Sequence, residues 1–141
     1  MSVDLIVYLP RASMPTPALW TKEIADAGFP VVLESDFDPY TATGFRPCRY
    51  RGVLSGFEFY SGPISAEEQD DLSLPPDYDF HVNLVTHSDL REFATSLIAA
   101  SVLCQLSGGL YYDPQESEQH SADGILSWAR AQLPLIEQEF N

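Results

Sequence analysis

The sequence predicts an α+β fold, a ferredoxin-like sandwich in which a β-α-β unit, a hairpin and a second β-α-β unit are followed by an extra C-terminal helix. Two observations support this prediction. Apolar runs of strand length alternate with helical patterns twice, over residues 3–34 and 80–112. Between them lies an aromatic-rich stretch with the turn residues of a hairpin. One domain over residues 1–141 is expected, since a chain of this length with 45% hydrophobic residues can bury most of its surface in one core.

The first unit begins with Val3–Leu9, an apolar run rich in β-forming residues that predicts a central strand. Thr16 and Pro17 then form a good helix start, because the hydroxyl can cap the first turn and proline suits the first helical position. We expect this helix to run to about Ala27 and Val31–Glu34 to form the next strand.

The middle of the chain has a less regular pattern. Glu34–Pro47 is expected to be a long loop or irregular edge with an acidic start. Tyr50–Leu54 and Phe57–Ser61 are expected to be two strands that meet at a tight turn over residues 55–56, although one long bulged strand fits the same residues. Gly62–Pro76 is polar and typical of a loop.

The second unit, Tyr78–Pro114, is the stretch with the clearest local signals. It starts with a partly alternating strand, Phe80–His87. Asp89 can cap the helix that follows, and Glu92 completes an acidic version of the capping box. A broad apolar stripe continues this helix until two glycines stop it, and Leu110–Tyr112 returns as a strand.

A last helix is expected over Ile125–Phe140, where apolar residues recur at helical spacing. Pro134 must kink or restart this helix, because proline lacks the amide hydrogen that a helix interior uses. The stretch between Pro114 and His120 is polar and typical of a connection.

Net charge is the strongest global signal. Twenty-one acidic residues face seven basic ones, which gives a formal net charge of −14. Such a field repels the phosphates of nucleic acid and of anionic membranes, so neither is an expected partner. The same field attracts basic proteins and speeds their encounter, although acidity can also serve solubility alone.

The chain shows no sign of export. Its N-terminus contains Asp4 and lacks the positive start of a secretory signal, and no apolar run approaches the length of a membrane span. Cys104 falls within an apolar helical pattern, where a buried thiol is the ordinary expectation, and Cys48 lies far from it in the sequence. We therefore expect a cytoplasmic protein without a structural disulfide.

Two acidic segments and three aromatic side chains form the candidate partner-binding surface. Glu34–Asp38 alternates acids in a loop, but it lacks the further ligands and the glycine of a calcium loop. Glu67–Asp71 is the most acidic patch and is typical of a solvated face or a short helical turn. The candidate residues are Glu34, Asp36, Phe37, Asp38, Tyr40, Glu67, Glu68, Asp70, Asp71 and Tyr78.

Two other functions are compatible with the sequence. In the first, Arg46, Arg49 and Arg51 line a pocket with Glu58 and a histidine, because three of the six arginines lie within six positions and guanidinium groups bind anions well. These arginines can equally neutralise the neighbouring acids. In the second, the protein is a homodimeric structural subunit that pairs through its terminal helix, with Trp128 exposed. The sequence does not decide between a monomer and a homodimer.

No catalytic residue, metal site or cofactor is expected. His87, Ser88 and Asp89 match a catalytic triad only in composition, because adjacent residues rarely align a nucleophile, a base and an orienting acid. His81 and His87 are too far apart along one strand to bind the same metal. The sequence also lacks a phosphate-binding glycine loop, zinc-ligand spacing and a dinucleotide fingerprint.

A likeness to a bacterial family lies in the second unit. Leu90–Glu116, about a fifth of the chain, resembles the helix, Gly-Gly and Asp-Pro-Gln segment of small uncharacterised bacterial proteins. Some of those proteins resemble immunity proteins encoded beside polymorphic or contact-delivered toxins, which implies a cognate protein toxin as the partner. The leading hypothesis is therefore a non-enzymatic binding protein that neutralises a toxin by covering its active site.

Overall fold

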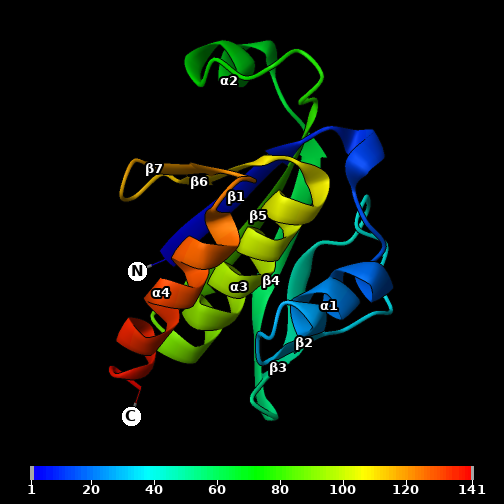
Figure 1. Cartoon of the computed structure of the whole chain (residues 1–141). Coiled ribbons are helices and arrows are strands. Elements are labelled where there is room, and N and C mark those ends of the chain that lie inside the picture. Colours follow the sequence, from blue (N-terminus) through cyan, green and yellow to red (C-terminus); the bar gives the residue numbers. More distant parts are fainter. Residues whose placement is uncertain (1, 141) are drawn as a thin grey trace.

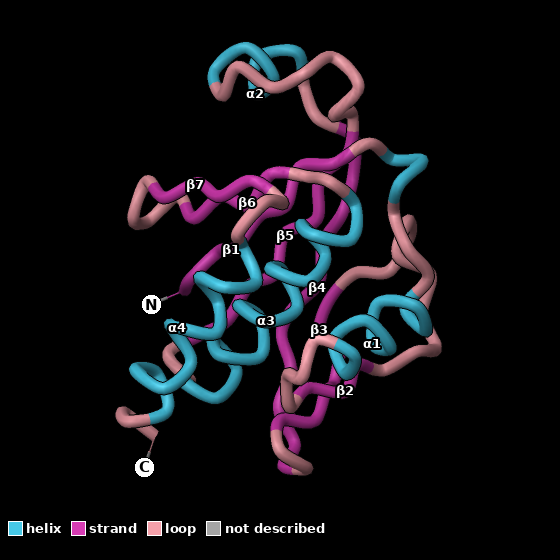
Figure 2. Tube along the Cα trace, in the orientation of Figure 1, coloured by secondary structure: helices cyan, strands magenta, loops and turns pink. Residues whose placement is uncertain are grey.

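The computed structural model describes residues 2–140 and shows an antiparallel sheet with helices on one face (Figure 1, Figure 2). The strands are β1 (Ser2–Leu9), β2 (Val31–Leu33), β3 (Gly44–Tyr50), β4 (Val53–Pro63), β5 (Phe80–His87), β6 (Leu110–Asp113) and β7 (Glu118–Ser121). The helices are α1 (Pro17–Asp26), α2 (Ala66–Asp71), α3 (Leu90–Ser107) and α4 (Ile125–Glu137), and a 3-10 turn spans Arg11–Ser13. Helices α1, α3 and α4 cover the sheet, whereas α2 stands apart at its upper end in Figure 1.

The strand order β2-β3-β4-β5-β1-β6-β7 contains two interleaved β-α-β units. Strand β5 lies between β1 and β4. Strand β1 lies between β5 and β6, the two strands that α3 connects. All of these pairings are antiparallel. This is the β-α-β-β-α-β order of a ferredoxin-like sandwich, with β2 and β3 added at one side and β7 at the other. The predicted α+β class is confirmed, and so is the helix that follows the second unit.

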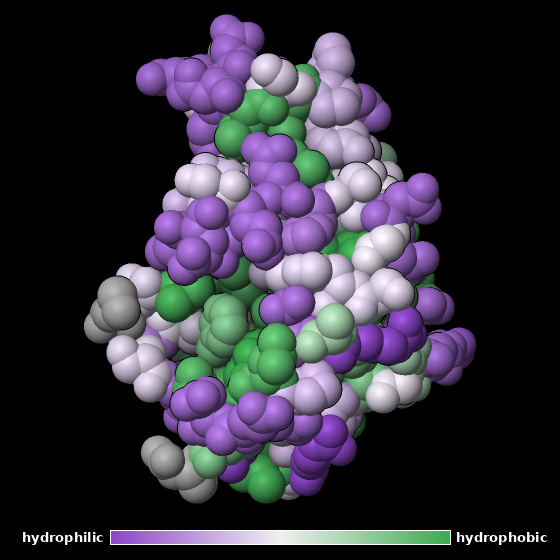
Figure 3. All heavy atoms as spheres, turned by 60° about the vertical axis from the view of Figure 1, so that its left-hand side comes forward, coloured by the Kyte–Doolittle hydropathy of each residue, from purple (hydrophilic) through white to green (hydrophobic). Residues whose placement is uncertain are grey.

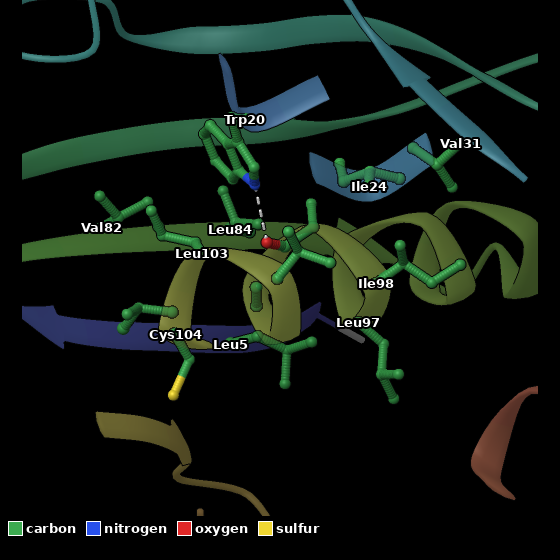
Figure 4. Packing of buried hydrophobic residues seen from close by; sticks show 14 of the residues in the cluster. Leu5, Trp20, Ile24, Val31, Val82, Leu84, Leu97, Ile98, Leu103 and Cys104 are labelled. Carbon is green, nitrogen blue, oxygen red and sulfur yellow. Dashed lines mark hydrogen bonds between the residues drawn. The ribbon is translucent and has the colours of Figure 1, made fainter. Parts of the chain in front are cut away.

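Helix α3 is the centre of the core. Asp89 caps it by accepting a hydrogen bond from an amide of the first turn at 2.9 Å, and Gly108 ends it in the left-handed conformation. Every residue over 94–104 is buried, because α3 is packed against the sheet as well as α1 and α4. Trp20 of α1 donates its indole N–H to the Ala99 carbonyl of α3 at 3.0 Å (Figure 4). The apolar stripe seen in the sequence is therefore the inner layer of the fold.

The β3–β4 hairpin turns at a different place from the one predicted. Its register puts Arg51 and Gly52 in the turn, both with positive φ, while residues 55–56 lie inside β4. Such two-residue turns favour Asn or Asp before Gly, since other residues are strained at positive φ. The Arg51 guanidinium binds the Glu137 carboxylate of α4, at 2.8 Å from Nε, so the turn is tied to the C-terminal helix. Strand β3 also starts at Gly44, within the predicted loop.

Three further differences concern polar segments. Strand β7 includes most of a stretch predicted to be a connection, and it pairs with β6 at the edge of the sheet. Its residues are all polar, because an edge strand of this kind buries little of either face. Helix α2 forms inside the predicted loop, with Ser65 as its cap, and it contains the acidic run for which a short helical turn was one of two expectations. Helix α4 ends at Glu137, before the predicted Phe140, and contains Pro134 near its C-terminal end.

The contacts of Glu137 predict a dependence of stability on pH. Arg51 and the Tyr50 hydroxyl donate to this carboxylate, and these hydrogen bonds lower its pKa below the usual 4.5. The unfolded state therefore binds the proton more readily, so the stabilisation is complete above the unfolded pKa and is lost as the pH falls through the folded pKa. Glu137→Gln is expected to flatten the dependence of the unfolding free energy on pH between about 5 and 3, measured by urea unfolding.

Glu139→Gln is the matched control for this measurement. Glu139 lies two residues further along and forms no ion pair with the described residues 2–140. Its variant should therefore keep the wild-type slope. Equal slopes for Glu137→Gln and the wild type would contradict the prediction.

Candidate functional site

The most acidic part of the structure is a short lobe at one end of the sheet. We call residues 64–79 the acidic lobe: they leave the end of β4, form α2 and return to the start of β5. The Ile64 amide donates to the Asp79 carbonyl at 3.2 Å and closes the base of the lobe. The lobe contains six acids and no basic residue: Glu67, Glu68, Asp70, Asp71, Asp77 and Asp79.

The lobe is held together by its own polar groups. The Ser65 hydroxyl caps α2 by accepting a hydrogen bond from the Glu68 amide at 3.1 Å. The Gln69 side chain donates to the Pro75 carbonyl at 3.0 Å, so the two arms of the lobe are tied to each other. Leu74 is its one buried apolar side chain among the described residues of this segment. The lobe therefore depends on local hydrogen bonds more than on an apolar core.

One acid of the lobe is directed back to the sheet. Glu68 lies against the Tyr8 hydroxyl of β1, and burial together with this carboxylate raises the pKa of Tyr8 to about 12. Glu67, Asp70 and Asp71 are exposed. In Figure 3 hydrophilic side chains gather at the top of the molecule, where Figure 1 places α2. These three carboxylates are thus free of ion pairs within the described chain and available to a partner.

The second acidic segment reaches the same end of the sheet. The Ser61 hydroxyl near the end of β4 donates to the Pro39 carbonyl at 2.7 Å, and the Tyr40 hydroxyl donates to the Arg11 carbonyl at 3.2 Å. Tyr40 also packs on Phe80, the first residue of β5. These contacts bring Asp38 close to the base of the acidic lobe. We call the lobe and Asp38 together the acidic end.

The predicted aromatic anchors all have internal contacts. Phe37 packs edge-on against Phe59, with ring centroids 5.2 Å apart, and Tyr40 lies between Phe80 and Arg11. The Tyr78 hydroxyl donates to a backbone carbonyl at the end of α3 at 2.5 Å. All three predicted anchors are half-buried and fix the loop and the lobe to the body of the protein. Their contact with a partner stays a prediction.

The two other acids of the predicted loop have different surroundings from Asp38. Glu34 pairs with Arg46 at 3.4 Å, and Arg46 also lies over the ring of Phe37. Asp36 is exposed. The predicted site residues are therefore only partly brought together: the acids of α2 and Asp38 share one end, and Glu34 lies at the end of β2.

The structure does not bring the three arginines and Glu58 into one pocket. Arg46 shares a side of β3 with the buried residues of that strand, and Arg49 lies on the opposite side. Arg51 lies in the hairpin turn and pairs with Glu137. Glu58 is on β4, where its partners are two other residues of the sheet. The prediction that these residues converge in an anion-binding or catalytic pocket is therefore wrong.

Glu58 instead belongs to a small polar group that the sequence did not predict. The Tyr60 hydroxyl donates to one carboxylate oxygen at 2.5 Å, and the His87 ring nitrogen Nε2 lies against the other. These hydrogen bonds, from Tyr60 first and then His87, lower the pKa of Glu58. The group is exposed on the sheet face opposite the helices, and it cross-links β4 and β5. Alternation along β4 could have suggested the Tyr60–Glu58 side, but the pairing with His87 depends on strand order.

The two cysteine thiols are not exposed for reaction. Cys48 and Cys104 are free and buried, and burial raises the pKa of each thiol to about 12. Over residues 2–140, no three side chains of the types His, Cys, Asp and Glu are placed to hold a metal ion. None of the helices in the described range is both long and apolar enough to cross a membrane. No protein-family model, curated protein or solved structure matches this chain.

Proposed function

We propose that this protein is a non-enzymatic binding protein, an immunity protein that neutralises a basic toxin by contact through the acidic end. The observation that supports this most is the acidic lobe, which has six carboxylates, no basic residue and an exposed position. A charged surface of one sign steers an oppositely charged partner into the encounter and suppresses wrong partners. The likeness of Leu90–Glu116 to toxin-associated proteins agrees with such a partner.

The position of the lobe in the chain also suits a contact with a partner. It is an insertion between β4 and β5, so its sequence can vary without any change to the sheet. The Leu90–Glu116 segment, in contrast, includes α3 and β6 and is mostly buried. The family likeness therefore lies in the scaffold, and the contact residues lie outside it.

Neutralisation by contact can be tested with the product of the adjacent gene as the partner. Co-expression should rescue cells from that product, and the two proteins should co-purify. Neutralising three exposed acids of α2 (Glu67→Gln, Asp70→Asn, Asp71→Asn) should weaken the complex by about 10- to 100-fold, mainly through slower association. The affinity of this variant should also fall less steeply with salt, because fewer charges are left to screen.

The matched control removes three exposed acids elsewhere, with Glu116→Gln, Asp123→Asn and Glu139→Gln. Both variants have the same net charge, so a loss confined to the lobe variant separates a local contact from a general charge effect. Surface plasmon resonance over a salt series gives both rates. Absence of rescue together with absence of co-purification would contradict the proposal.

A further inference from the structure

Apolar side chains gather on the sheet face opposite the helices, near the β3–β4 turn. Val32 is 58% exposed, Leu54 62% and Phe45 48%, and Pro47 is exposed as well. We call these four residues and Arg49 the hairpin patch. Half-exposed large apolar side chains that adjoin one another are unusual on a monomer surface and mark contact sites.

The strand register shows that the hairpin patch is contiguous. Val32 of β2 pairs with Arg49 of β3, which pairs with Leu54 of β4, so the three side chains form one row. Pro47 lies in the next row of the same face. The Phe45 ring lies over Gly56, close enough to leave no room for a side chain there. The patch is therefore a continuous surface across three strands.

The open edge of β2 is not available for adding another strand. The Leu33 amide donates to the Thr21 hydroxyl of α1 at 2.9 Å, so this amide is already bonded to a side chain. Strand β2 has only three residues, which further limits pairing with another chain. A partner of the hairpin patch must therefore pack on the face of the sheet.

Arg49 in the patch and Glu34 beside it carry opposite charges. Arg49 is exposed and forms no ion pair or side-chain hydrogen bond with the rest of the described chain. Val32, Leu54 and Arg49 line a shallow groove of about 180 Å³ together with Glu34. The Glu34 carboxylate has one ion-pair contact, to Arg46 at 3.4 Å, through one of its two oxygens. Arg49, which has no ion pair within the described chain, and Glu34 thus border the same groove.

We propose that the hairpin patch binds a second copy of this chain about a two-fold axis. In such a dimer the apolar rows of the two copies face each other. Arg49 of each copy binds Glu34 of the other, so the interface contains two equivalent ion pairs. Two-fold interfaces require this self-complementarity, because the same surface serves both partners. Five side chains fall short of the roughly 800 Å² per partner of a standard interface, so we expect a weak, transient dimer.

This surface differs from the terminal helix through which the sequence suggested pairing. Trp128 is half-buried, since its ring packs on His120 at 4.1 Å between centroids and edge-on against Tyr111 at 5.3 Å. Leu135 is 59% exposed on α4, and it gives a control that matches Leu54 in type and exposure. The proposed dimer does not depend on the immunity function.

Sedimentation equilibrium of the wild-type protein tests the dimer. The salt should be about 0.15 M, where the Debye length of about 8 Å screens the distant acids of the two copies from each other. Leu54→Glu is expected to weaken self-association at least about tenfold, because it buries a charge in the apolar rows. Leu135→Glu is expected to change it less than about twofold.

A charge exchange tests the proposed ion pairs. Arg49→Glu and Glu34→Arg should each weaken self-association about tenfold or more, since like charges then face each other twice. Mixing the two variants should restore the dimer, because every pair in the mixed dimer again joins a carboxylate and a guanidinium. Circular dichroism confirms that each variant is folded. A monomeric wild type, a loss specific to Leu135→Glu, or no recovery on mixing would each overturn the proposal.

Discussion

Replacing Trp20 with alanine is expected to lower the free energy of unfolding by about 4 kcal/mol. Trp20 is fully buried, and its indole joins α1 to the centre of α3 through the hydrogen bond to Ala99 (Figure 4). Alanine would leave a large cavity beside Ile24 and Leu84, two of its neighbours in the core. Domains of this kind have a total stability of roughly 5–15 kcal/mol, so the variant would be close to its unfolding threshold.

The measurement is urea unfolding followed by far-UV circular dichroism, with the midpoint of thermal unfolding expected to fall by roughly 12 °C. Leu19→Ala is the control on the same helix. Leu19 is 42% exposed, so its truncation should cost below about 1 kcal/mol. Trp20→Phe should lie between the two, since it keeps an aromatic ring and loses the N–H donor. Equal losses for Trp20→Ala and Leu19→Ala would show that α1 does not stabilise the core in this way.

Features set by neighbouring residues could be predicted from the sequence. The caps of α1 and α3 are examples, because Thr16 and Asp89 each accept a hydrogen bond from an amide three positions on. The apolar stripe of α3 also predicted the core, since an 18-residue helix that is apolar on most sides must be buried. With this helix and the shorter helical pattern after Pro17 each lying between strand patterns, the α+β class followed.

Features set by distant contacts could not be predicted. The hairpin turns at Arg51 and Gly52, where Arg51 also binds Glu137, 86 positions away; the sequence placed the turn at another glycine, Gly56. Strand β7 is polar throughout and becomes a strand because β6 offers an open edge. In the candidate site, the acids of α2 were predicted from their run in the sequence. A surface shared with Asp38 was predicted from charge alone. The contacts of Tyr40 and Pro39 that place Asp38 beside the lobe could not be predicted, because they are made with other elements.

The two proposed contact surfaces lie at opposite ends of the sheet. The acidic end adjoins the end of β4 and the start of β5, whereas the hairpin patch adjoins the start of β4 and the turn before it. Figure 1 shows α2 at the top and the β3–β4 turn at the bottom. The two proposals are therefore compatible, since the self-contact and the contact with a partner would use different ends of the sheet. A dimer would then present two acidic ends that face away from the shared interface.

Gly108 and Gly109 show how two identical neighbours can have different roles. Both were predicted to stop the helix, and Gly108 does so with a φ of 70°. Gly109 has a second role, because the chain passes over the end of β1 at this point. A Cβ built on Gly109 would lie 2.5 Å from the Tyr8 carbonyl oxygen and 3.3 Å from the Leu9 Cβ. The carbonyl is part of the backbone and cannot turn away, so the strands themselves would have to separate.

Gly109→Ala is therefore expected to lower the free energy of unfolding by about 3 kcal/mol, at the upper end of what one added methyl group costs in a packed site. Gly62→Ala is the matched control, since its Cβ would lie 3.7 Å from a side-chain atom of His81 in ordinary contact. Alanine there restricts the unfolded chain and should be neutral or stabilise by about 0.5 kcal/mol. Opposite signs for the two variants in urea unfolding would support a close approach of β1 and the α3–β6 connection. A loss below about 1 kcal/mol for Gly109→Ala would show that the connection can move away from β1, and the tight contact would then contribute little to the fold.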